Sequence, residues 1–67
     1  MSQSGYVHLE DCNIVRETSA AVWVEHDGLR HWIPKSQIAN PGDYSEGDEG
    51  VTVSITEWIA EQKGIEL

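Results

Sequence analysis

The chain has 67 residues, with twelve Asp and Glu against four Lys and Arg, and its formal net charge is −8. Direct binding of DNA or RNA needs cations that replace the counterions on phosphates, so this composition argues against direct nucleic-acid binding and against adhesion to anionic lipid. The single cysteine excludes an internal disulfide, and a chain of this length predicts one domain, 1–67.

Nothing in the sequence predicts export or a membrane span. The start, MSQSGYVHLED, has neither the basic stretch nor the apolar stretch of a signal peptide. The longest apolar run, AAVWV, is far too short to cross a bilayer. A lone thiol fits a reducing compartment. We therefore expect a cytoplasmic protein with no membrane partner, and the sequence leaves its oligomeric state open.

The stretch YVHLEDCNIV predicts a bent strand. Val7 and Leu9 lie on one face, and the apolar phase then shifts to Cys12 and Ile14. Because a strand cannot change face without a bulge or a bend, we expect one near Glu10–Asp11.

The stretch AAVWVEHDGLRHWIP predicts a β-hairpin. Two runs of β-favouring residues flank Asp27–Gly28, a pair typical of a two-residue type I′ turn. That turn fixes the register, so Trp23 should face Trp32. One face of the hairpin should then carry Val22, Val24, His31 and Ile33, and the other face the tryptophan pair with Glu25 beside Arg30.

Short elements are expected after the hairpin. Pro34 has no N–H to donate and should end the ladder or lie at an edge, and KSQI predicts a single helical turn. VTVSITE alternates, so residues 51, 53 and 55 should point inward. EWIAEQKG predicts a helix with Thr56 as its N-cap and Gly64 at its end. The predicted fold is α+β, a small antiparallel sheet of about four strands curling toward an SH3-like barrel, with a short C-terminal helix.

The three tryptophans allow two interpretations. Tryptophan is enriched at interaction hot spots, so Trp23 and Trp32 could form an exposed platform for a partner. Alternatively, the C-terminal helix lays Trp58 over the pair. Because a bare indole pair favours aggregation, we expect at least two of the three tryptophans to be buried.

The sequence predicts neither a metal site nor a catalytic site. The three histidines and Cys12 lack the spacing of Cys-x-x-Cys or His-x-x-x-His ligands. A calcium loop starting at Asp43 would require glycine where Asp48 stands. No nucleophile–base pair can be placed from the spacing. We therefore predict a protein that is not an enzyme and has no cofactor, and a metal-binding or ligand-binding barrel is a third hypothesis.

Acidic side chains dominate residues 36–67, where Lys63 is the sole base. The loop NPGDYSEGDEG and the helix after it predict a continuous negative ridge, on the scale of the one charge per ~3.4 Å along a DNA strand. Such a ridge could imitate nucleic acid and occupy a basic groove, or it could serve solubility alone. The candidate partner-binding residues are Asp43, Tyr44, Glu46, Asp48, Glu49, Glu57, Glu61, Trp23 and Trp32.

The stretches HWIPKSQI and EWIAEQKGI resemble small acidic proteins encoded by phages and other mobile elements. The likeness covers residues 20–67 and transfers no site residue. Several such proteins block host defence, as anti-CRISPR proteins do. The resemblance therefore implies an inhibitor of a basic, nucleic-acid-handling complex such as a CRISPR effector, in the cytoplasm of a bacterial host cell. The alternative is an accessory protein-interaction module of a phage replication or recombination assembly that uses the Trp23/Trp32 face.

Overall fold

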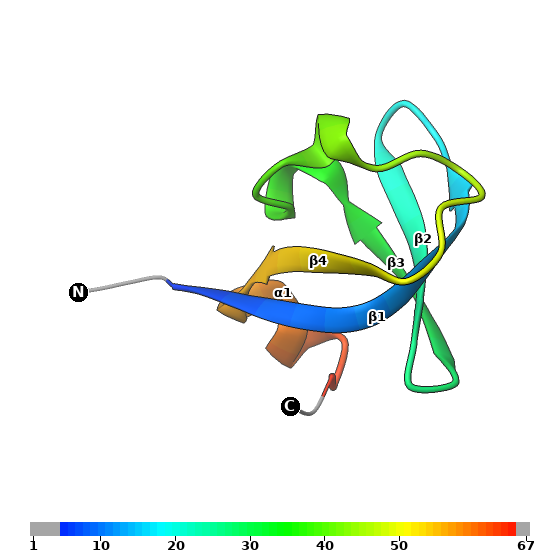
Figure 1. Ribbon diagram of the computed structural model, residues 1–67. Coiled ribbons are helices and arrows are strands. Elements are labelled where there is room, and N and C mark those ends of the chain that lie inside the picture. The colour runs from blue at the N-terminus through cyan, green and yellow to red at the C-terminus, as the bar shows by residue number, and fades with distance from the viewer. Residues whose placement is uncertain (1–4, 66–67) are drawn as a thin grey trace.

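The structure is a computed structural model, and it describes residues 5–65. The elements are β1 (Tyr6–Glu17), β2 (Ala21–His26), β3 (Leu29–Pro34), the short 3-10 turns η1 (Lys35–Gln37) and η2 (Pro41–Asp43), β4 (Val51–Thr56) and α1 (Glu57–Gln62). The strands form one antiparallel sheet in the order β3-β2-β1-β4 (Figure 1). The predicted α+β class, a four-stranded antiparallel sheet with a short C-terminal helix, is confirmed, and the sheet is not closed into a barrel.

The long strand β1 joins the two halves of the sheet. Its first part pairs with β4 and its second part with β2. The β4 register shifts between Leu9 and Cys12, and Asp11 there has a φ of 59°. This left-handed conformation accommodates the extra residue of a bulge. The predicted bend is confirmed, and it keeps Leu9, Cys12 and Ile14 in one core despite the change of phase.

The β2–β3 hairpin has the predicted register at every cross-strand pair. Asp27 and Gly28 have φ values of 54° and 79°, and a type I′ turn requires positive φ at both positions. Pro34 ends β3, which is an outer strand of the sheet, as predicted. The turn η1 follows directly, in the place where the sequence predicts a helical turn.

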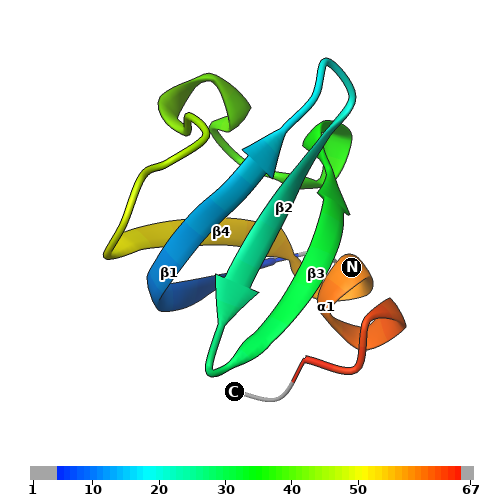
Figure 2. The same cartoon turned by 90° about the vertical axis from the view of Figure 1, so that its right-hand side faces the viewer.

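The strand β4 is covered on its outer side and leads into the helix. Ile38 bridges to Ile55, and the Ala39 N–H donates to the Ser54 carbonyl at 2.9 Å. Figures 1 and 2 both show the 40–50 loop entering β4 at one end of the strand and α1 following its other end. The acidic residues that flank β4 in sequence therefore belong to two separate segments, the loop before the strand and the helix after it.

The caps of α1 are those that the sequence predicts. The Thr56 hydroxyl accepts a hydrogen bond from the Ile59 N–H at 3.2 Å. At the other end, the Gly64 N–H donates to Glu61 and the Ile65 N–H to Ala60, at 3.2 and 2.9 Å. Gly64 has a φ of 68°, so this is a Schellman motif.

The core lies between the inner face of the sheet and the segments that cover it. Ile65 packs against this core from the C-terminal turn. No polar or charged side chain is buried within residues 5–65, and none of the helices described there is long and apolar enough to cross a membrane. The buried residues are Leu9, Cys12, Ile14, Val22, Val24, Ile33, Ile38, Tyr44, Val53, Ile55, Ile59 and Ala60.

Candidate functional site

Two stacked indoles form an aromatic surface on the outer face of the hairpin. The ring centroids of Trp23 and Trp32 are 5.3 Å apart, with 6° between the ring planes. The Arg30 guanidinium lies 5.4 Å from the Trp23 ring centroid, and its Nε is 3.7 Å from a Glu25 carboxylate oxygen. We call Trp23, Trp32 and Arg30 the tryptophan platform. An exposed cation–π contact contributes about 0.5–1 kcal/mol, so the platform is held together by interactions within the hairpin itself.

The prediction that at least two tryptophans are buried is wrong. Trp32 is 39% exposed and Trp58 is 58% exposed, and Trp23 is partly exposed. The helix α1 packs on β1 and β4 and buries Ile59 and Ala60 there. It has six residues, or ~9 Å of length, and it starts directly after β4. Because the helix packs on the inner face of the sheet and the Trp23/Trp32 pair lies on the outer face, Trp58 does not cover the pair.

The acidic loop is fastened to β1 by its backbone. The Gly47 N–H donates to the Ile14 carbonyl, and the Ile14 N–H donates to the Asp48 carbonyl, each at 2.8 Å. The Ser45 N–H donates to the Asp48 carboxylate at 2.9 Å. The Gly50 N–H donates to the Asn13 side chain at 3.2 Å. These bonds hold the loop in one conformation beside the second half of β1.

Tyr44 requires a correction to the role expected of it. Its side chain is only 8% exposed, and its hydroxyl donates to the Thr52 carbonyl at 2.8 Å. The aromatic ring adds to the core, and the hydroxyl meets a backbone acceptor of β4. Tyr44 therefore anchors the loop to the sheet and is not an exposed anchor for a partner.

The carboxylates of the predicted negative ridge come from two separate segments of the structure. The loop acids (Asp43, Glu46, Asp48 and Glu49) precede β4, and the helix acids (Glu57 and Glu61) follow it. The six residues of β4 span ~20 Å, and Figure 1 shows the loop entering one end of this strand and α1 following the other. One loop acid also reaches β1, where the Glu17 N–H donates to the Glu46 carboxylate at 3.2 Å.

Almost none of these charges is neutralised. Within the part of the chain that the structure describes, the ion pairs are Arg30–Glu25 and Lys35–Glu17, the latter at 2.8 Å. The loop acids and the helix acids have no basic partner there. Unpaired charges of one sign raise the local concentration of oppositely charged ligands, so both ends of β4 should attract cationic groups.

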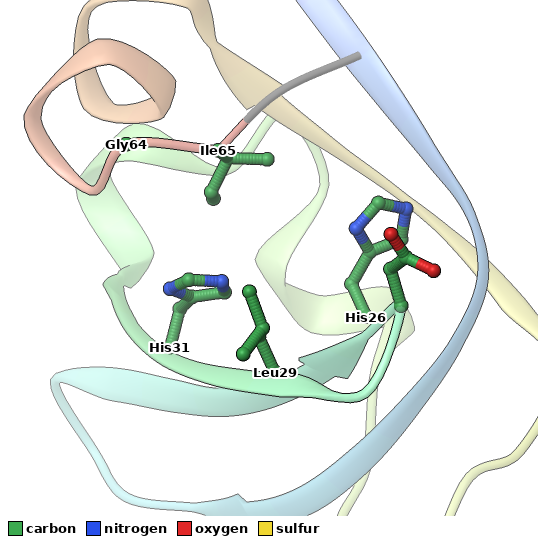
Figure 3. Close-up of a pocket in the computed structure, with 6 residues that line it drawn as sticks. His26, Leu29, His31, Gly64 and Ile65 are labelled. Atoms are coloured by element: carbon green, nitrogen blue, oxygen red, sulfur yellow. The ribbon is translucent and has the colours of Figure 1, made fainter.

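A cavity of about 220 Å³ lies between the tip of the hairpin and the C-terminal turn (Figure 3). It is lined by His26, Asp27, Leu29, His31, Gly64 and Ile65. Burial lowers the pKa of His31, and the nearby charges of Lys63 and His26 lower it further. This favours the neutral imidazole. Residues 5–65 contain no group of three His, Cys, Asp or Glu side chains that could hold a metal ion.

Two further groups have structural explanations. Burial raises the pKa of Cys12 to about 11, and the thiol donates to the Leu9 carbonyl at 3.2 Å. A buried protonated thiol is a poor nucleophile. His8 Nδ1 lies 2.7 Å from the Ser54 hydroxyl, a contact that the spacing did not suggest, because it joins directly opposed residues of β1 and β4. In the described residues no carboxylate is hydrogen-bonded to His8, so the third member of a catalytic triad is missing.

A second concave site lies where α1 meets the start of β1. An open groove of about 340 Å³ is lined by three apolar residues, Val7, Ala60 and Ile65, and by both helix acids. Sequence reasoning paired the two glutamates but missed the groove, because Val7 comes from the opposite end of the chain. Comparison with protein-family models, with curated proteins and with solved structures found no match for this chain.

Proposed function

We propose that this protein is a non-catalytic interaction protein that binds a basic, nucleic-acid-binding surface of another protein and thereby blocks it. The observation that carries the proposal is the group of loop acids without a basic partner. Negative charges on a protein surface steer it toward a basic patch and discriminate against partners of the same sign. The same charges would disfavour binding of the nucleic acid itself.

The fastening of the loop supports the proposal further. Association costs less when the binding groups are already held in place. The backbone bonds from Gly47 and Asp48 to Ile14, with the Tyr44–Thr52 bond, fix the loop before any partner arrives.

In its specific form, the proposal is that the protein acts as an anti-CRISPR-like inhibitor in the cytoplasm of a bacterial host cell. Its partner would be a nucleic-acid-handling complex such as a CRISPR effector. The support for this form is the resemblance of HWIPKSQI and EWIAEQKGI to small acidic phage proteins. The proposal includes a curl of the sheet toward an SH3-like barrel, which the bend of β1 favours.

The test is displacement of nucleic acid. Purified bacterial DNA-binding and RNA-binding proteins, CRISPR effector complexes among them, are each loaded with a fluorescent oligonucleotide, and its release is followed by anisotropy as this protein is added. We expect displacement from at least one of them, weakening steeply as salt rises. Displacement from none, or displacement that is insensitive to salt, would contradict the proposal.

The best charge-reversal variant is Glu49→Lys. Its carboxylate makes no hydrogen bond or ion pair with residues 5–65, whereas Asp48 accepts the Ser45 N–H and is part of the loop structure. A control with the same change of net charge is the Leu29→Lys/Gln62→Lys pair, two exposed residues outside the loop. We expect Glu49→Lys to weaken displacement and the control to leave it near the wild-type level.

A second candidate is the accessory interaction module, which the exposure of the tryptophan platform favours. There the partner would pack on Trp32, and the acids would serve solubility. Exposed aromatic residues are common binding hot spots. Under this alternative Trp32→Ala removes partner binding while Glu49→Lys leaves it intact, the reverse of the result expected for the blocking function.

A further inference from the structure

The groove between α1 and the start of β1 combines two properties that a surface acid alone does not have. Its volume is about 340 Å³, and Val7, Ala60 and Ile65 give it an apolar lining. Glu57 and Glu61 supply two carboxylates from one face of α1, one helical turn apart. A ligand that fits must therefore be apolar along part of its length and positively charged at another part.

Both carboxylates lack a cation among the described residues. Neither Glu57 nor Glu61 forms an ion pair there. Lys63 follows Glu61 by two residues, a spacing that does not face it on a helix. The Lys63 charge acts on His31, where it helps to lower the pKa of that imidazole. Like charges one turn apart repel each other, so a cation placed between them would relieve the repulsion.

We propose that this groove binds an arginine side chain presented by the basic surface of a partner protein. The aliphatic stem of an arginine packs on apolar surface while its guanidinium stays near charge and water. The guanidinium is planar, has five N–H donors and loses less hydration than an ammonium, so it can bond two carboxylates at once. Val7, Ala60 and Ile65 would contact the stem, and Glu57 and Glu61 would accept from the guanidinium.

This inference rests on the proposed binding of a basic protein surface and names one of its contacts. It gives the loop acids and the helix acids different tasks in binding. The loop acids would attract the partner through their charge, and the groove would hold one side chain by shape as well as charge.

The experiment uses the full chain, isotopically labelled, and titrates it by NMR with Nα-acetyl-arginine methylamide. Two matched probes accompany it: the citrulline analogue, which has nearly the same shape without the charge, and guanidinium alone, which has the charge without the stem. We expect the arginine probe to shift the signals of Val7, Ala60 and Ile65 and the carboxyl carbons of both helix acids. Each matched probe should bind roughly threefold to tenfold more weakly.

Two double variants locate the site. Glu57→Gln/Glu61→Gln removes both charges of the groove and should weaken the arginine probe by a similar factor, roughly threefold to tenfold. Asp43→Asn/Glu49→Gln removes the same charge from the loop and should leave the affinity near the wild-type value. Equal binding of the citrulline probe, or equal weakening by the two double variants, would overturn the inference. The citrulline comparison on the wild-type chain decides the matter even if a variant folds poorly.

The result is separable from that of the displacement experiment. Displacement of nucleic acid without arginine binding in the groove would support the blocking function and show that the groove takes no part in it. Arginine binding in the groove without displacement from any tested protein would contradict the blocking function alone.

Discussion

The loop acids precede β4 and the helix acids follow it, and the surroundings of the two groups differ. The loop acids are carried by a segment that hydrogen bonds to β1 hold in place, and Tyr44 below them belongs to the core. The helix acids border an open groove with apolar walls. Charge without accessible apolar surface mainly accelerates encounter, whereas charge beside apolar surface also slows dissociation. Two groups of equal sign can therefore contribute to different steps of one binding event.

The largest expected effect comes from Tyr44, which anchors the loop to the core. Tyr44→Ala removes a buried aromatic ring and should lower the free energy of unfolding by about 3–5 kcal/mol, as other large-to-Ala core substitutions do. Urea unfolding measures this. Tyr44→Phe is the milder control, because it removes only the hydroxyl that bonds to Thr52 and should cost about 1 kcal/mol. Faster exchange of the Gly47 and Ile14 amide protons should accompany either change, and exchange as slow as in the wild type would show that Tyr44 does not hold the loop.

The next prediction tests whether the loop acids and the helix acids contribute to different steps of binding. Glu49→Lys should lower the association rate with a displaced nucleic-acid-binding protein by about tenfold at low salt, because it weakens electrostatic steering. Glu57→Gln/Glu61→Gln should act mainly by raising the dissociation rate. Stopped-flow kinetics at two salt concentrations separates the two rates. If both variants changed only the association rate, the two ends of β4 would have the same task.

A smaller loss of stability is expected when the N-cap of α1 is removed. Thr56→Ala removes the side chain that accepts the Ile59 N–H, and loss of such an N-cap costs about 1 kcal/mol. The Thr56 hydroxyl also donates to the Gln37 side chain at 2.6 Å, so η1 should loosen with the helix. Thr52→Ala, at an exposed position of the same strand, should stay within about 0.5 kcal/mol of the wild type. Similar losses of unfolding free energy in the two variants would contradict the capping role.

The smallest effect is a pH dependence beside the C-terminal turn. The pKa of His31 is lowered from 6.5 by burial first and by the Lys63 and His26 charges next. The unfolded chain therefore binds a proton more readily than the folded one, so this contribution to stability is complete above pH 6.5 and is lost as the pH falls through the folded pKa. Urea midpoints between pH 8 and pH 5 measure the loss. His31→Gln should show a shallower decline, and an unchanged slope would exclude His31 as its source.

Local chemistry determined what could be predicted. The Asp27–Gly28 turn fixes every pair of the hairpin from neighbouring residues, and Thr56 and Gly64 mark the ends of α1 in the same way. The loop is different, because its position depends on bonds to Ile14, which lies far away in the sequence. No spacing rule relates the two segments, so the attachment of the loop to β1 could not be predicted from the sequence.

The candidate site shows the same limit. The expected burial of the tryptophans failed because α1 covers the inner face of the sheet, whereas the Trp23/Trp32 pair lies on the outer face. Tyr44 resembled an exposed anchor between charged residues, yet its hydroxyl meets a backbone acceptor on β4. The groove brings Val7 together with residues between 57 and 65, so it can be recognised only once the fold is known. The i, i+4 glutamates were the only part of it that a sequence could supply.

The bent strand β1 also has a consequence for how the chain folds. The β1–β2–β3 meander joins strands that follow one another in sequence, whereas β4 must return from the other end of the chain to pair with Tyr6 and Val7. Closing so long a loop costs more entropy than closing a hairpin and slows the search. The pairing of β4 with β1 should therefore limit the refolding rate. The loop acids and the helix acids, which flank β4, would reach their binding conformation together in this last step.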